Sequence, residues 1–239
     1  MEELTWWQAK PALLDDIRAA LTGHYASLML SVTPEGVTVR GSFPVVHLDE
    51  VLDRYEVEIN FPDDYPDDPP SLRETGGRIP RVPERHNSSG VACLFVPIDW
   101  KAKRTDLAFR TFLDEPVKQY FAKQSLVEEG QPWPSGERAH GVPGALEALR
   151  ELIGVDTDEA ALRALALLAE PTIKGHWPCV CGSAKRLRDC HGPALRKLQS
   201  PTNLQWARKM IVAHIQDLCR ERDLAVAAID EMRPRSTAA

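Results

Sequence analysis

The stretch between residues 61 and 100 decides the predicted fold. It opens with FPDDYPDDPP (residues 61–70), continues through HNSSG (residues 86–90) to Cys93 and Leu94, and ends at Trp100. Six prolines lie between residues 62 and 90, and each removes an amide donor and restricts φ. Regular sheet is therefore excluded here, and the segment is either a simple surface loop or a stiff wall that presents Cys93. A cis bond is expected at Tyr65-Pro66.

Regular elements are predicted before this stretch. Apolar residues at spacings of three and four predict a helix over residues 11–21. Three strand-like segments follow, rich in apolar and β-branched residues, which predicts an antiparallel meander with short turns. They are residues 25–32, 37–43 and 55–61, and residues 71–75 could add a fourth, short strand.

Helices are predicted after this stretch. Residues 105–123 carry an apolar face, and Pro116 inside it should kink or split that helix. Gly154 ends a further helix, Asp156 is the expected N-cap of the next, and Ser200 is the expected cap of a long amphipathic helix. Strands followed by helices predict an α+β fold.

Composition limits the classes of protein to which the chain can belong. Its 239 residues allow one core and a small accessory module, and 43% apolar and 27% charged residues are ordinary for a globular protein. A net charge of −6 argues against a broad nucleic-acid surface. The sequence has no apolar run of 18 residues and no signal-peptide pattern, so we expect a cytoplasmic protein without a membrane span.

Three of the five cysteines fall within twelve residues, followed directly by a histidine. In a reducing compartment such clustering favours metal over disulfides. Three thiolates and one imidazole suit tetrahedral zinc without an open position, which is a structural site. The predicted ligands are Cys179, Cys181, Cys190 and His191. Cys219, on the last helix, is expected to be a buried or half-buried spectator.

Cys93 is the other candidate for chemistry. A single cysteine among apolar neighbours is often only core filler. His86 and Asn87 lie shortly before it. The Asn87 carboxamide could donate to the oxyanion of a thioester intermediate, or it could simply brace its own loop.

Together these motifs resemble the ubiquitin-conjugating enzymes. That family carries Phe-Pro-x-x-Tyr-Pro-x-x-Pro-Pro, then His-Pro-Asn, then Gly-x-Ile-Cys-Leu and a tryptophan. The matching positions here are Phe61, Pro62, Tyr65, Pro66, Pro69, Pro70, His86, Asn87, Gly90, Cys93, Leu94 and Trp100. The resemblance covers about residues 10–150 and implies that family's fold.

The resemblance implies that Cys93 receives a ubiquitin-like protein from an activating enzyme and passes it to an amine of a protein target. Asn87 would be the oxyanion donor or loop brace, and His86 would be mainly structural. The chain departs from the family pattern in three places. No proline separates His86 from Asn87, and Asn87 lies only six residues before Cys93, which puts the reach of its amide to the oxyanion in doubt. Asp67 and Asp68 replace aromatic and basic residues, which puts partner recognition in doubt.

These departures make the chain more similar to the prokaryotic relatives of the family, some of which belong to antiviral-defence gene clusters. The segment from Trp133 through Glu137 to His140 and Gly141 is also similar to those relatives. The resemblance implies that His140 or Glu137 could assist the incoming amine. The alternative is a structured loop that Trp133 packs.

The cysteine cluster resembles the zinc motif at the C-terminus of the SecA translocation motor, where it serves as a docking surface for partners. The predicted organisation is a ubiquitin-conjugating-enzyme-like domain over residues 1–154 and a connecting helix over 155–172. A zinc module over 173–199 and a C-terminal helix and tail over 200–239 follow.

Two rival functions remain open. One is a non-catalytic scaffold of the same fold that binds a ubiquitin-like protein or another partner through the zinc module. The other is a zinc-dependent nucleic-acid binder, against which the net charge of −6 argues.

Overall fold

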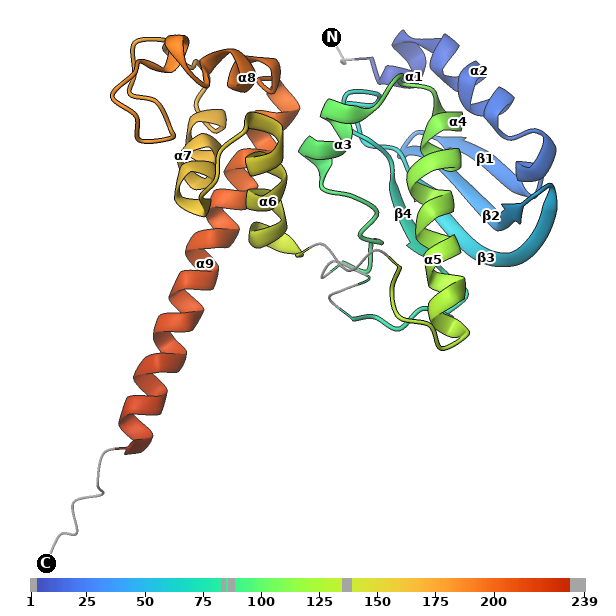
Figure 1. Cartoon of the computed structure of the whole chain (residues 1–239). Coiled ribbons are helices and arrows are strands. Elements are labelled where there is room, and N and C mark those ends of the chain that lie inside the picture. Colours follow the sequence, from blue (N-terminus) through green and yellow to red (C-terminus); the bar gives the residue numbers. More distant parts are fainter. Residues whose placement is uncertain (1–3, 83–84, 86–88, 135–138, 233–239) are drawn as a thin grey trace, which may run out of the picture. The chain divides into compact units, whose positions relative to one another are not determined.

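The computed structural model describes residues 4–82, 85, 89–134 and 139–232, with side chains described as far as residue 225. The chain divides into two compact units, Met1–Arg138 and Ala139–Ala239, coloured blue to green and yellow to red in Figure 1. None of the helices in these described ranges is long and apolar enough to cross a membrane.

The N-terminal unit begins with two helices and a sheet. Its four strands pair in the order β1-β2-β3-β4, and each pair is antiparallel, so the predicted meander is confirmed. Leu48 and Asp49 join β2 to β3 with φ of 46° and 64°, as a tight two-residue hairpin requires. The elements are α1 (Trp6–Ala9), α2 (Pro11–Ala20), η1 (Gly23–Tyr25), β1 (Leu28–Thr33), β2 (Gly36–His47), β3 (Glu50–Asn60) and β4 (Ser71–Glu74).

One face of this sheet forms the core. The alternation of apolar and polar residues places Val39 and Phe43 of β2 and Tyr55 of β3 on the buried face. Helix α5 (Lys118–Glu128) crosses that face in Figure 1. Its Phe121 stacks on Tyr55 with ring centroids 4.5 Å apart and lies 5.4 Å from Phe43.

The helix predicted over residues 105–123 begins later than expected. Its observed parts are α4 (Phe109–Phe112), a π-turn η2 (Leu113–Val117) and α5, preceded by the separate helix α3 (Pro97–Lys103). The Phe109 amide donates to the Asp16 carboxylate of α2 at 2.9 Å, a long-range cap that local sequence does not reveal. Pro116 interrupts the α-helical pattern as predicted, because it lies in the π-turn.

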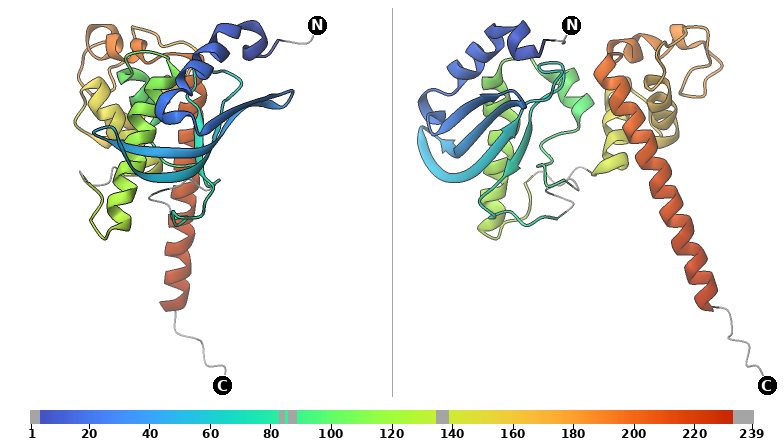
Figure 2. Two further views of the ribbon diagram at one scale, coloured as in Figure 1. Left: turned by 90° about the vertical axis from the view of Figure 1, so that its right-hand side faces the viewer. Right: turned by 180° about the vertical axis from the view of Figure 1, so that it is seen from behind.

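The C-terminal unit is helical in its described part. It comprises α6 (Gly141–Ile153), α7 (Asp158–Leu168), η3 (Leu187–Asp189), α8 (Gly192–Lys197) and α9 (Pro201–Met232). Figure 2 shows α9 continuing well beyond the short helices of its own unit. Ile215 and Leu218 of its predicted apolar stripe are accordingly more than half exposed.

Two expectations for this part of the chain differ from the structure. The N-cap of α7 is Thr157, whose hydroxyl accepts the Ala160 amide at 3.2 Å, and not Asp156. Helix α6, placed in the first domain by its position in the sequence, belongs to the second unit because it packs against α7 and α9. The predicted stop at Gly154 (φ 72°) and cap at Ser200 are confirmed, since the Ser200 hydroxyl accepts the Asn203 amide.

A charged network fastens the end of α5 to the sheet. The Arg78 guanidinium donates to both Asp53 oxygens at 2.8 Å and to Glu128 at 2.5 Å, and it lies 4.1 Å from the centre of the Tyr55 ring. These bonds from Arg78 lower the pKa of Asp53 to about 2. Because the folded pKa lies below the unfolded one, Asp53 stabilises the fold above about pH 4 and loses that contribution as the pH falls toward 2.

We therefore expect Arg78→Ala to lower the free energy of unfolding by about 1–2 kcal/mol at pH 7, since the partly exposed carboxylates of Asp53 and Glu128 lose a charged donor. The loss of stability between pH 7 and pH 3 should also be smaller in this variant, because Arg78 no longer lowers the pKa of Asp53. Equilibrium urea unfolding at both pH values measures the two effects. Arg40→Ala, which removes the 65%-exposed side chain that pairs with Glu58, should change stability by less than about 0.5 kcal/mol.

Candidate functional site

Cys93 lies beside the last strand of the sheet. It follows Gly90, whose φ of 78° favours glycine. The Ala92 amide donates to the Leu72 carbonyl of β4 at 2.8 Å, and the Cys93 amide donates to the Arg85 carbonyl at 2.9 Å. Two consecutive backbone bonds, one to the sheet and one to the preceding loop, thus hold the half-buried thiol in position.

Aromatic residues surround this segment. Phe95 and Trp100 stack with centroids 4.9 Å apart, and Phe112 meets the edge of both rings. On another side, the Tyr120 hydroxyl of α5 donates to the Arg85 carbonyl at 3.2 Å. Trp100 therefore packs against Phe95 and Phe112. The Tyr120 contact escapes sequence analysis because it is made to a backbone atom.

The proline-rich loop is rigidly attached. Tyr65-Pro66 is cis, as expected from the sequence. The Tyr65 ring packs in the core against Trp6 and Phe61, with centroids 4.9 Å from each. Arg104 donates to the Pro66 carbonyl at 3.2 Å, and Lys101 pairs with Asp68. The proline-rich loop is therefore packed against the core and is not a simple surface loop.

Electrostatics keep Cys93 in its thiol form at neutral pH. Burial raises the pKa of the Cys93 thiol above its ordinary value. Burial also raises the pKa of Tyr120, and the neighbouring charge of Cys93 raises it further. Tyr120 is therefore a neutral hydrogen-bond donor at neutral pH, and Cys93 is a protected thiol.

The other predicted catalytic residues are not brought to Cys93 by the described structure. His86, Asn87 and Glu137 lie outside the described residues. His140 is exposed at the N-cap position of α6, in the other unit, so its approach to Cys93 stays a prediction. Trp133 is half-buried and meets the edge of Tyr120 at 6.1 Å. That contact agrees with the packing alternative for the loop.

The predicted metal ligands are brought together in the C-terminal unit. One ligand atom from each of Cys179, Cys181, Cys190 and His191 lies within 4.8 Å of the others. His191 Nδ1 is 3.2 Å from the sulfur of Cys179 and 3.3 Å from that of Cys190. Gly182 (φ 75°) allows the turn that wraps this segment. The four side chains could hold a metal ion.

The outer contacts of this cluster orient its ligands. His191 Nε2 lies 3.2 Å from the Gly154 carbonyl at the end of α6. Donation from Nε2 to this carbonyl leaves Nδ1 unprotonated and free to bind a metal. The Ser183 hydroxyl lies 3.3 Å from the Cys181 sulfur. The site therefore has the second layer of polar contacts that is typical of protein metal centres.

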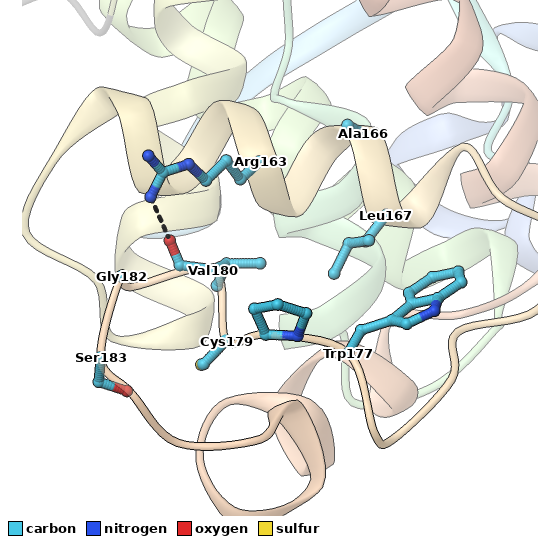
Figure 3. Close-up of a pocket in the computed structure, with 9 residues that line it drawn as sticks. Arg163, Ala166, Leu167, Trp177, Cys179, Val180, Gly182 and Ser183 are labelled. Atoms are coloured by element: carbon cyan, nitrogen blue, oxygen red, sulfur yellow. Dashed lines mark hydrogen bonds between the residues drawn. The ribbon is translucent and has the colours of Figure 1, made fainter.

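A shallow groove of about 480 Å³ adjoins the cluster, between α7 and residues 177–183. Figure 3 shows Leu167 and Trp177 along its apolar side, and Pro178 also lines the groove. Arg163 donates to the Val180 carbonyl at 3.4 Å across one end. Arg163 also pairs with Glu159 at 2.5 Å. The metal-ligating segment is thus fastened to α7 through a backbone carbonyl.

Comparison with models of known protein families, with curated proteins and with solved structures found no match to this chain.

Removing one ligand tests the metal centre. We expect the purified protein to hold one metal ion per chain, and Cys181→Ser to lose it, because the ligand set becomes incomplete. Residues 174–200 should then exchange amide hydrogens at least about tenfold faster, since binding a structural metal supplies much of the folding free energy of small metal-binding modules. Elemental analysis and hydrogen exchange measure both effects. Cys219→Ser, at the exposed cysteine of α9, should keep the metal. A metal-free wild type with slow exchange in this segment would contradict the assignment.

The protected state of Cys93 predicts its reactivity. Iodoacetamide attacks the thiolate, so its reaction with Cys93 should be slower than with an unperturbed thiol at pH 7. The rate should also continue to rise with pH beyond the pKa of an ordinary cysteine. Peptide-resolved mass spectrometry as a function of pH measures this, with the exposed Cys219 as an internal reference. An inflection at or below the inflection of Cys219 would show that Cys93 is an activated thiolate.

Proposed function

We propose that the N-terminal unit carries a ubiquitin-like protein as a thioester on Cys93, received from an activating enzyme and passed to an amine of a protein target. The fold that we propose for this unit is that of the ubiquitin-conjugating enzymes. It rests on the order of elements: a helix, a four-stranded antiparallel meander, a proline-rich loop with the cysteine, and then helices.

One observation carries this proposal. Cys93 is half-buried, and the segment that carries it is held by two backbone bonds, from the Ala92 amide to Leu72 on the sheet and from the Cys93 amide to Arg85 on the loop. A thiol that must meet the carbonyl carbon of a bulky partner needs a fixed position and one open side.

The chemistry is thioester exchange followed by aminolysis. The Cys93 thiol loses its proton as its sulfur attacks the thioester carbonyl carbon on the activating enzyme. A new C–S bond forms, and the enzyme's own C–S bond breaks, releasing its thiol. The target amine then attacks the same carbon, a C–N bond forms, and Cys93 regains its proton as it leaves. Exchange between thioesters is nearly isoenergetic, so positioning contributes more than a strong base would.

Zinc is the metal that we propose for the C-terminal unit. Zn–S bonds of about 2.3 Å in a tetrahedron put two sulfurs about 3.8 Å apart. The sulfurs of Cys181 and Cys190 lie 3.8 Å apart. Four protein ligands would leave no open position, so the proposed role is structural.

Recruitment is the proposed role of this unit. Between residues 174 and 197 the chain has six Lys and Arg residues and one acidic residue, a balance of +5 in a chain of net charge −6. This local basic surface favours an acidic face on the activating enzyme or on the target. The resemblance of the cysteine cluster to the SecA zinc motif supports the same role. The resemblance of the N-terminal unit to prokaryotic conjugating enzymes supports a place in bacterial antiviral defence.

Intact mass tests the proposal. The protein is co-expressed with a candidate activating enzyme and a candidate ubiquitin-like protein taken from neighbouring genes. We expect an adduct of the mass of the ubiquitin-like protein minus water, removed by thiol reductant and absent from Cys93→Ala. Cys93→Ser should give a reductant-resistant oxyester, and Cys219→Ser should behave as wild type. If the two partners react together but leave Cys93 unmodified, the protein is the non-catalytic scaffold.

A further inference from the structure

The position of Cys93 depends on one backbone atom of the preceding loop. Its amide donates to the Arg85 carbonyl at 2.9 Å, whereas Ala92 is the residue bonded to the sheet. Any movement of that carbonyl would therefore move the thiol. The loop residues next to Arg85 include several prolines and glycines but no regular element among the described positions.

A buried tyrosine from a different element holds the same carbonyl. Tyr120 is 4% exposed and donates its hydroxyl to the Arg85 carbonyl at 3.2 Å. Its ring meets Phe121 at 5.3 Å, next to the aromatic core that fixes α5 on the sheet. The carbonyl thus accepts one bond from the Cys93 amide and one from Tyr120 of α5, the helix that packs on the sheet.

The side chain of Arg85 is held as well. Its guanidinium carbon lies 3.9 Å from the centre of the Trp133 ring, a cation–π contact. Trp133 in turn meets Tyr120 edge-on at 6.1 Å. Backbone and side chain of Arg85 are therefore held by two aromatic residues that also touch each other.

We propose that Tyr120 is a positioning residue for Cys93, acting through the Arg85 carbonyl, with Trp133 holding Arg85 in place. The inference rests on the proposed function for its purpose, because a thioester carrier must present its sulfur in one position. It adds to that function by naming Tyr120 as the residue that fixes the position of the Cys93 thiol through the loop. The contact that carries this role is the hydrogen bond from the Tyr120 hydroxyl to the Arg85 carbonyl.

The arrangement also explains why a tyrosine suits this place. A phenolic hydroxyl is a neutral donor at neutral pH, so it adds no charge beside a forming thiolate. Phenylalanine would fill the same space and keep the contacts with Phe121 and Trp133, but it would leave the carbonyl with one donor fewer. The segment would then open more often and admit water to the thiol.

The experiment compares Tyr120→Phe with wild type in the full chain. The first readout is the rate of iodoacetamide reaction at Cys93 as a function of pH, resolved by peptide mass spectrometry. We expect the rate at pH 7 to rise about fivefold, the change that one hydrogen bond of ordinary strength produces, and the inflection to move to lower pH. The second readout is hydrogen exchange of the Cys93 amide, which should accelerate by a similar factor.

Tyr25→Phe is the matched control. Tyr25 is 3% exposed and also donates one hydrogen bond from its hydroxyl, to Asp114 at 2.7 Å. It should lower stability by a comparable amount without moving the Cys93 profile. Trp133→Leu is the second variant. It removes the contact between Trp133 and Arg85, so it should shift the pH profile of Cys93 in the same direction as Tyr120→Phe. It keeps the inference testable if Tyr120→Phe folds poorly.

An unchanged pH profile and unchanged Cys93 exchange in Tyr120→Phe and Trp133→Leu would overturn the inference. An equal shift in Tyr25→Phe would overturn it too, since the effect would then reflect stability alone. Neither readout uses a ubiquitin-like protein. If no thioester adduct forms but the pH profile of iodoacetamide reaction at Cys93 shifts in Tyr120→Phe, the positioning role stands and the carrier function fails. If the adduct forms but the profile does not shift, only the positioning role is rejected.

Discussion

The N-terminal unit depends on the packing of Phe121 against Tyr55 and Phe43. This contact places α5 across the buried face of the sheet, with ring centroids 4.5 and 5.4 Å apart. Once α5 is fixed there, its neighbouring residue Tyr120 points to the loop that holds Cys93, and its last turn brings Glu128 to Arg78. One aromatic contact thus determines both the stability of the fold and the place of the thiol.

Sequence patterns could predict the elements because each pattern acts locally. Alternation of apolar residues predicted the first three strands, and glycine and serine predicted the ends of α6 and α9. Spacing alone also identified Cys179, Cys181, Cys190 and His191, since metal ligands are recognised by residue type. The expected cis bond at Tyr65-Pro66 followed in the same way from a single local signal.

Long-range contacts to backbone atoms could not be predicted. The cap of α4 comes from Asp16, 93 residues away in sequence, and the orientation of His191 comes from the Gly154 carbonyl. Tyr120 was predicted only as part of an apolar face, because nothing in a helical pattern shows that its hydroxyl meets the Arg85 carbonyl. Every residue has a carbonyl, so no sequence motif marks the one that matters. Asp156 failed as a cap for a simpler reason, since Thr157 offers the same chemistry one residue later.

The five cysteines of the chain lie in three different environments, and each environment favours a different reactivity of the thiol. The three cysteines of the cluster meet a histidine that Gly154 orients, so the four side chains together could hold a metal ion. Cys219 was expected to be buried or half-buried, but it is exposed because the far part of α9 extends beyond the short helices of its own unit.

Cys93 is neither exposed nor clustered, and burial raises its pKa. A high pKa slows random oxidation and alkylation, and it costs little in thioester exchange, where attacking and leaving sulfurs are alike and position decides the rate. The burial of Cys93 and the backbone bonds of Ala92 and Cys93 therefore act together: they protect the thiol and fix its position, and both properties suit the proposed thioester carrier.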